Sequence, residues 1–338
     1  MKEVEKRALE LFREHFGQPE AMKAIAASGS GRRYYRIAGK NRSVIATVGT
    51  DAAENEDFFA LQGALKADGI KVPDVYAVSA DRMVYLQQDL GNISLFDRAK
   101  APDFASFVLG KMFEEAMRTL PHLQTGARTV GTAALVRPPF GSRLILWDLN
   151  YFKYCFLKPK DIAMDENLLE DDFQLMAKRL SSCKPELWGF MYRDCQSRNI
   201  MAHNGDLYWI DFQGGRPGPI VYDVVSMLWQ ARLALNDATQ RRFINVYARE
   251  LASLRPVSEE EATQAVYEMV PLRVLQTLGA YGMRGLTQRK EHFLKSIPLA
   301  LRSLRGLIDN GTFEPYPELK RISQYICDKP EIYVSTGK

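Results

Sequence analysis

Residues 191–214 read MYRDCQSRNIMAHNGDLYWIDFQG, and this stretch decides how the chain is interpreted. A short apolar pair, Ile200-Met201, and the apolar run LYWI at 207–210 flank the sequence HNGD at 203–206. Asn-Gly between two apolar runs is typical of the turn of a β-hairpin. The stretch therefore predicts a hairpin with polar residues at its open end.

Three polar side chains surround this hairpin. Asp194 and Asn199 lie in the loop that leads into it, and Asp211 follows its second strand. Each of these residues alone is weak evidence for a functional site, because Asp and Asn are common in turns. Together, Asn199 and Asp211 can converge on one point with hard oxygen atoms that suit Mg²⁺, while Asp194 stays free to accept a proton from an attacking hydroxyl. This D-x-x-x-x-N…D-F spacing is typical of kinase-type phosphoryl transfer.

Composition excludes several classes of protein. The 338 residues are 46% hydrophobic and 25% charged, which indicates a globular protein with one large or two medium domains. A net charge of +4 is too small to indicate a nucleic-acid binder. The four cysteines form no C-x-x-C pair, which argues against disulfide and zinc sites. With no apolar stretch near the ~18 residues of a membrane span, we expect a soluble cytoplasmic protein.

The pattern of the chain changes near residue 90. An opening helix, two antiparallel hairpins and a helix rich in acids precede DLGN at 89–92, which we interpret as a hinge. We therefore predict an α+β fold of two lobes, a small β-rich lobe at 1–90 and a larger, mostly helical lobe at 91–338. Helices in the second lobe are predicted near 103–124, 147–158, 166–182, 222–235, 238–253, 259–280 and 292–307.

The sequence SGSGRRYYRI at 28–37 has two interpretations. A plain flexible turn is the simpler one. A lobe that covers a nucleotide, however, needs such a turn, and its backbone N–H groups with Arg32 or Arg33 could reach phosphate oxygens. The second interpretation depends on the hairpin and its acids.

Asp148, in LILWDLNYF, is also open to two interpretations. It could be an acid at the start of a helix whose Trp147, Tyr151 and Phe152 enter the core, or a polar contact in a substrate pocket. Asp223 is expected to cap a helix and brace the catalytic loop. The four histidines lack ligand spacing and are assigned no catalytic role.

These segments resemble the aminoglycoside phosphotransferase/choline kinase group, and within it the bacterial kinases of N-acetylmuramate and N-acetylglucosamine. The resemblance rests on YRDCQSRNIM, LYWIDFQGG, PIVYDVVSMLWQARLAL, SGSGRRYYRI, VYLQQDLGNISLFD and WDLNYF. It covers residues 28–232 with gaps, and faintly LGAYGMRGL near 278–286. It implies a protein-kinase-like fold and an ATP-dependent kinase that uses Mg²⁺.

The resemblance also implies residue roles. Asp194 becomes the catalytic base, Arg193 beside it serves catalysis and substrate binding, and Asn199 and Asp211 hold Mg²⁺. Asp148 contacts the sugar. The residues implied to bind ATP are Ser28, Gly29, Ser30, Arg32 and Arg33 over the phosphates and Gln88, Asp89 and Leu90 beside the adenine.

One departure from the family pattern leaves the prediction of kinase activity open. The strand SVIATV at 43–48 lacks the lysine that normally holds the phosphates and pairs with a helix glutamate, and Thr47 lies roughly in its place. Arg32, Arg33 or Arg36 could substitute. The favoured activity is phosphorylation of a sugar, at the anomeric hydroxyl of N-acetylmuramate or N-acetylglucosamine in cell-wall recycling. The alternatives are an aminoglycoside- or choline-type phosphotransferase and a nucleotide-binding regulatory pseudokinase.

Overall fold

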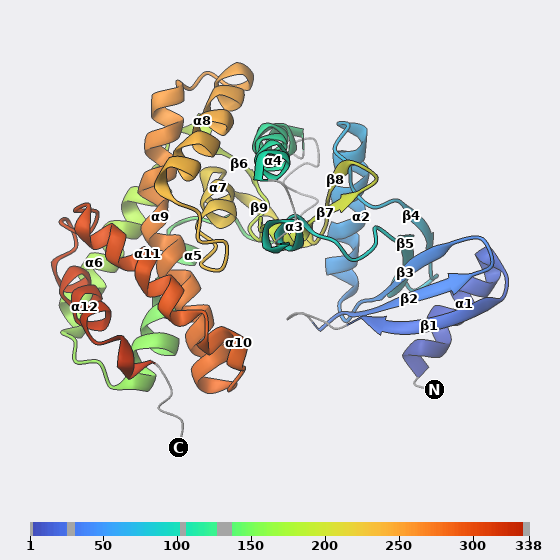
Figure 1. Ribbon diagram of the computed structural model, residues 1–338, viewed down its shortest axis with the longest axis horizontal. Helices are drawn as coiled ribbons and strands as arrows, with labels where there is room; N and C mark the ends of the chain where they lie inside the picture. Colours follow the sequence, from blue (N-terminus) through green and yellow to red (C-terminus); the bar gives the residue numbers. More distant parts are fainter. Residues whose placement is uncertain (1–2, 26–30, 102–105, 127–136, 334–338) are drawn as a thin grey trace. The chain divides into compact units, whose positions relative to one another are not determined.

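The computed structural model describes residues 3–25, 31–101, 106–126 and 137–333 (Figure 1). The chain forms two compact units, Met1–Arg137 with Ser197–Gly215, and Pro138–Gln196 with Arg216–Lys338. We call them the sheet unit and the helical unit. An antiparallel sheet in the first and a helical second unit confirm the predicted fold class. The lobe boundary at residue 90 stays a prediction.

The sheet unit contains an antiparallel sheet of five strands in the order β1-β2-β3-β5-β4 (blue to teal in Figure 1). Alternation along the strands turns Ile37, Val44 and Leu86 toward the apolar face of α1, where they form one core with Ala8 and Phe12. The elements are α1 (Glu3–Phe16), β1 (Pro19–Ile25), β2 (Arg33–Gly39), β3 (Ser43–Val48), α2 (Ala52–Ala67), β4 (Val75–Val78) and β5 (Val84–Gln88).

The helix α2 is bounded as its sequence suggests. The Asp51 side chain accepts from the Ala53 backbone N–H at its start. Gly69, just beyond its end, has a φ of +77°, which glycine adopts without strain. Phe58 of this helix stacks on Tyr85 of β5 with ring centroids 4.9 Å apart, which attaches α2 to the sheet.

The predicted hairpin belongs to the sheet unit. Strands β7 (Ile200–His203) and β8 (Asp206–Trp209) pair antiparallel around Asn204 and Gly205, both at positive φ, as an Asn-Gly turn requires. The remaining helices of this unit are α3 (Leu95–Lys100) and α4 (Ser106–Gly126).

The helical unit is built around α9, against which several helices pack (orange in Figure 1). In the part of the chain that the structure describes, no helix is long and apolar enough to span a membrane. The helices are α5 (Ser142–Phe152), continued by a π-helical turn at Lys153–Leu157, α6 (Glu166–Ser181), α7 (Val221–Leu228), α8 (Asp237–Leu254), α9 (Glu259–Tyr281), α10 (Glu291–Leu294), α11 (Ile297–Asp309) and α12 (Pro317–Asp328).

Glycines let α9 and its continuation approach the α5 segment backbone to backbone. A Cβ added at Gly282 would lie 2.0 Å from the Cys155 carbonyl oxygen, and one at Gly279 would lie 2.8 Å from the Phe152 nitrogen. Both distances are too short for a side chain, so these positions require glycine. This contact explains the sequence LGAYGMRGL, which resembled the kinase family only faintly.

Some predicted elements differ from the structure. The helix expected at 147–158 begins at Ser142, so Asp148 lies in its second turn and does not open it. Trp147, one candidate for the core, is 67% exposed. The helix expected at 222–235 ends at Leu228. Strand β1, the pair β6 (Trp188–Met191) and β9 (Arg216–Pro219), and the helices α3 and α12 were not predicted.

Candidate active site

The open end of the hairpin brings Asn199 and Asp211 together. Ile200 pairs with Trp209, and the Ile210 N–H donates to the Asn199 carbonyl at 3.0 Å. The antiparallel register therefore continues one step beyond the strands, and Asp211 follows Ile210 directly. The two residues therefore lie at the same end of the hairpin, and the convergence of their side chains on a metal ion stays a prediction.

Gln213 adds a third oxygen beside them. Its Nε2 donates to Asp211 Oδ1 at 2.7 Å, while its Oε1 is buried without a hydrogen-bond partner. A buried oxygen of this kind usually has a partner that is a protein group, a water or an ion. It is a hard oxygen like the side-chain oxygens of Asn199 and Asp211, and a donor set of this chemistry fits Mg²⁺.

The backbone at Asp211 is strained and held from one side by stacked rings. Asp211 has a φ of +68°, a left-handed conformation that is uncommon outside glycine and often marks functional sites. Phe212 stacks on Phe58 of α2, with centroids 5.0 Å apart and rings 5° from parallel. Phe58 also stacks on Tyr85, so a column of aromatic rings connects the segment Asp211–Gln213 to the sheet.

The residues predicted to cover the phosphates are only partly described. Ser28, Gly29 and Ser30 lie outside the described residues. Arg33 is exposed on β2, whereas Arg32 is 3% exposed and donates to the Tyr85 hydroxyl, the Glu54 carbonyl and Asn55 Oδ1. Arg32 Nη2 also lies 3.6 Å from Glu54 Oε1, so the helix glutamate has a cationic partner.

The segment Gln88–Leu90 is anchored in the sheet unit by its own groups. The Gln88 N–H donates to the Asp74 carbonyl at 2.8 Å, and the Leu90 carbonyl contacts His203 Nδ1 at 3.2 Å. Arg36 donates to both oxygens of the Asp89 carboxylate, at 2.7 and 2.9 Å. Arg36 therefore braces this segment.

The helical unit contains Asp194 in a loop that Asp223 holds. The Asp223 carboxylate accepts the backbone N–H groups of Tyr192 and Arg193, at 2.8 and 2.9 Å. This confirms that Asp223 braces the loop, whereas the cap position of α7 is occupied by Ile220, without a side-chain cap. Asp194 is exposed at its tip, and the neighbouring Cys195 is completely buried, which raises the pKa of its thiol.

Arg193 and Asp148 form an ion pair within this unit. Arg193 Nη2 donates to Asp148 Oδ1 at 2.9 Å, and the guanidinium lies 4.5 Å from the Phe140 ring centroid. Arg193 has a φ of +76°, so its strained backbone is held by Asp223 while its side chain is held by Asp148. Two buried atoms of the pair, Arg193 Nη1 and Asp148 Oδ2, have no hydrogen-bond partner.

A second buried arginine was not found from the sequence. Arg273 of α9 donates to the Tyr222 hydroxyl at 3.1 Å and lies 5.5 Å from its ring centroid, while Arg193 lies 5.4 Å from the same ring. Burial lowers the pKa of Arg273, but its neighbours Tyr222 and Asp194 raise it above its ordinary value. In the sequence, Arg273 is a single arginine among apolar residues, and no motif or spacing relates it to Asp194.

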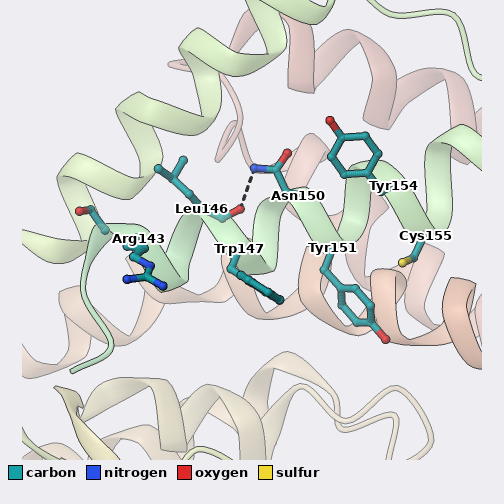
Figure 2. A pocket seen from close by; sticks show the side chains of 8 residues that line it. Arg143, Leu146, Trp147, Asn150, Tyr151, Tyr154 and Cys155 are labelled. Carbon is teal, nitrogen blue, oxygen red and sulfur yellow. Dashed lines mark hydrogen bonds between the residues drawn. The ribbon is translucent and has the colours of Figure 1, made fainter. Parts of the chain in front are cut away.

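The helix that contains Asp148 has a groove along its outer side (Figure 2). Trp147 and Tyr151 project to one side of α5, and Asn150 projects to the other, where its Nδ2 donates to the Leu146 carbonyl. The cavity measures about 650 Å³, and Asp148 does not line it. The groove and the Arg193–Asp148 pair are therefore separate features of the helical unit.

Comparison with known proteins identifies the family. The profile of the Phosphotransferase enzyme family (APH) matches residues 21–257, which is most of the chain and includes every predicted site residue. The chain belongs to the APH phosphotransferase family. It is thus an enzyme that transfers a phosphoryl group to a hydroxyl group, as its sequence predicts.

Individual relatives agree with this family. The chain is 24% identical to the N-acetylmuramate/N-acetylglucosamine kinase of Pseudomonas aeruginosa over 95% of its own length and 93% of the relative's. It resembles the structure of a microcompartment-associated aminopropanol kinase, with a TM-score of 0.62, 17% identity and coverage of 88% and 94% of the two chains. The amicoumacin kinase hAmiN, solved with AMP-PNP, Ca²⁺ and Ami, gives a TM-score of 0.59 at 14% identity, over 83% and 85% of the chains. These two structures support the APH fold.

Proposed function

We propose that the protein is an ATP- and Mg²⁺-dependent sugar kinase that phosphorylates the anomeric hydroxyl of an N-acetylated amino sugar such as N-acetylmuramate or N-acetylglucosamine. The observation that carries the proposal is the Arg193–Asp148 pair, with one buried donor and one buried acceptor left unpartnered. The hydroxyl and acetamido groups of such a sugar both donate and accept hydrogen bonds, so they can satisfy both atoms. The name of the relative from Pseudomonas aeruginosa supports the same substrate class.

The same pair argues against a cationic acceptor. An ammonium group placed on Asp148 would also face Arg193, whose pKa lies above its ordinary value and which therefore stays charged. The second arginine, Arg273, adds to this positive charge beside Tyr222. Like charges in a partly desolvated site repel strongly, so aminoglycosides and choline are disfavoured.

In this proposal Asp194 is the catalytic base. It accepts the proton of the acceptor hydroxyl while that oxygen bonds to the γ-phosphorus and the bond to the leaving ADP oxygen breaks. Asp223 and Asp148 position the loop around it through the backbone and side chain of Arg193. Asn199, Asp211 and Gln213 would hold Mg²⁺, which would neutralise charge on the phosphates.

The segment Gln88–Leu90 is proposed to lie beside the adenine, held in place by Asp89 and Arg36. Ser28, Gly29, Ser30 and Arg33 are proposed to serve the phosphates, while the buried Arg32 is proposed to support them from the interior through its contacts with Glu54, Asn55 and Tyr85. We place the reaction in the cytoplasm, where ATP is available and where the four free cysteines remain reduced. Cell-wall recycling is the process we propose for it.

The test is an acceptor panel with ATP and Mg²⁺ that includes N-acetylmuramate, N-acetylglucosamine, an aminoglycoside and choline. ADP release measures turnover, and phosphorus NMR locates the new phosphate. We expect an acetylamino-sugar 1-phosphate, absent with Asp194→Asn. Phosphate on another hydroxyl would disprove the anomeric assignment, and turnover of choline or an aminoglycoside alone would disprove the sugar assignment.

A further inference from the structure

Strand β3 contains no charged side chain that could hold phosphate. Thr47 occupies roughly the place of the family's lysine, and it is completely buried. Its hydroxyl accepts a hydrogen bond from Gln87 Nε2 at 2.9 Å. A cation for the phosphates must therefore come from another part of the chain.

Two arginines meet Glu54, one of the two glutamates at the start of α2 that such a lysine could contact. Arg32 Nη2 and Arg137 Nη2 lie 3.6 and 3.7 Å from the same oxygen, Glu54 Oε1, on the first turn of α2. The two differ in exposure, because the Arg32 side chain is 3% exposed and that of Arg137 is 33% exposed. Arg32 also donates to three other groups, which locks it in the interior.

Arg137 has a second contact that links it to the metal-binding segment. Its Nε donates to the Gln213 carbonyl at 3.2 Å. Gln213 in turn donates to Asp211, so a chain of polar contacts runs from Glu54 through Arg137 to the Asp211 carboxylate. The partly exposed guanidinium is thus held beside the donor set that fits Mg²⁺.

The single carboxylate of Glu54 contacts two cations at one of its oxygens. One carboxylate faces two guanidinium groups, and the buried Arg32 needs that negative charge most, because an uncompensated buried cation is costly. Arg137, closer to solvent, keeps a positive charge that can act on an incoming anion.

We propose that Arg137 contacts the nucleotide phosphates in place of the missing lysine, with Arg32 as the buried partner of Glu54. The inference rests on the proposed use of ATP. It divides the two tasks of one lysine between two arginines. Arg32 orders α2 from inside, and Arg137 supplies charge to the phosphates and couples their binding to the segment of Asp211.

The experiment compares binding of ATP and of adenosine, with Mg²⁺ present, by titration calorimetry. Arg137→Gln is expected to weaken ATP binding about tenfold while adenosine binding stays unchanged, because one charge-assisted contact to phosphate is lost. Arg137→Lys should retain part of the ATP affinity. The matched control is Arg82→Gln. It breaks the ion pair of Arg82 with Glu56, which lies in α2 like Glu54, and it should leave the affinities for ATP and adenosine unchanged.

The outcomes separate the two proposals. If wild-type protein binds ATP and Arg137→Gln binds it equally well, Arg137 is not the phosphate ligand and the kinase proposal stands. If Arg137→Gln weakens adenosine and ATP alike, Arg137 has a structural role only, and the inference is wrong. If wild-type protein does not bind ATP, both the inference and the proposed function are overturned.

Discussion

Arg193 Nη2 donates to Asp148 Oδ1 at 2.9 Å, across 45 positions of the sequence. The pair joins the residue before the proposed base to the middle of α5. Burial lowers the pKa of Arg193, but the neighbouring Tyr222 and Asp148 raise it above its ordinary value. Arg193 therefore stays charged throughout the pH range in which the protein would work.

Asp148→Asn should destabilise the helical unit, because the mostly buried Arg193 would lose its counter-charge. Asp148 is 3% and Arg193 22% exposed, so we expect a loss of about 2–3 kcal/mol in the free energy of unfolding. Denaturant unfolding measures it. Arg193→Gln and the double variant complete a mutant cycle, and additive losses would contradict the interaction.

Asp194→Asn should lower kcat by about 10³-fold and leave ATP affinity unchanged, because the amide cannot accept the proton of the hydroxyl. Steady-state kinetics on the best acceptor and a nucleotide titration measure the two quantities. Asp206→Asn, in the hairpin turn where Asp206 pairs with Lys71, is the control and should keep wild-type kcat. If the Asp194→Asn variant kept the wild-type kcat, a residue other than Asp194 would be the catalytic base.

Most of the fold was predictable because its signals are local. The hairpins around Lys40 and Gly205 and the end of α2 at Gly69 depend on turn chemistry and apolar periodicity. Strand β1 was missed because it is an edge strand with mostly exposed residues and no clean alternation. Strand β9 reads RPGP, which has no strand propensity, and it exists because it pairs with β6.

The same distinction applies to the site. Asn199 and Asp211 were placed together because one short hairpin separates them. Arg137 and Glu54 are 83 positions apart in the sequence, and only folding brings them into contact. No motif near Arg137 in the sequence indicates that it belongs to a site. Long-range ion pairs carry no periodicity, so only the packed structure reveals them.

Gly282→Ala should be strongly destabilising, by about 3 kcal/mol, because its Cβ would overlap the Cys155 carbonyl and force the two segments apart. The control is Gly306→Ala in α11, where a Cβ meets nothing within 4 Å. That substitution should stabilise the protein by about 1 kcal/mol, since alanine is the better helix former. Thermal unfolding of both variants tests the prediction, and equal effects would refute the close packing.

Gln213→Leu should weaken divalent-cation binding, because it removes the amide that orients Asp211 and the buried Oε1. We expect the Mg²⁺ concentration for half-maximal ATP binding to rise about tenfold, as for other residues that orient a ligand. Titration of Mg²⁺ at fixed ATP measures it. Gln87→Leu, which removes an amide from β5 instead, serves as the control, and an unchanged Mg²⁺ requirement in Gln213→Leu would exclude Gln213 from the metal site.

Asp89 gives the sheet unit a defined dependence on pH. Burial raises the pKa of Asp89, but hydrogen bonds from Arg36, Ser43 and the Gly91 N–H lower it further, so it lies below its ordinary value. A lowered carboxyl pKa stabilises the folded state above the unfolded value of ~3.9, and this contribution is lost as the pH falls through the folded value.

Asp89→Asn should therefore cost about 2 kcal/mol at pH 7 and progressively less as the pH falls from ~4 through the lowered folded pKa, because the carboxyl is protonated first in the unfolded state and then in the folded state. Urea unfolding of wild type and variant from pH 7 to about pH 3 measures the difference between them. Ser43→Ala, which removes one of the donors to the same carboxylate, should show a smaller loss with the same dependence on pH. A loss that stays constant down to pH 3 would mean that the stabilisation comes from packing around Asp89, because only the charge of the carboxylate disappears over this range.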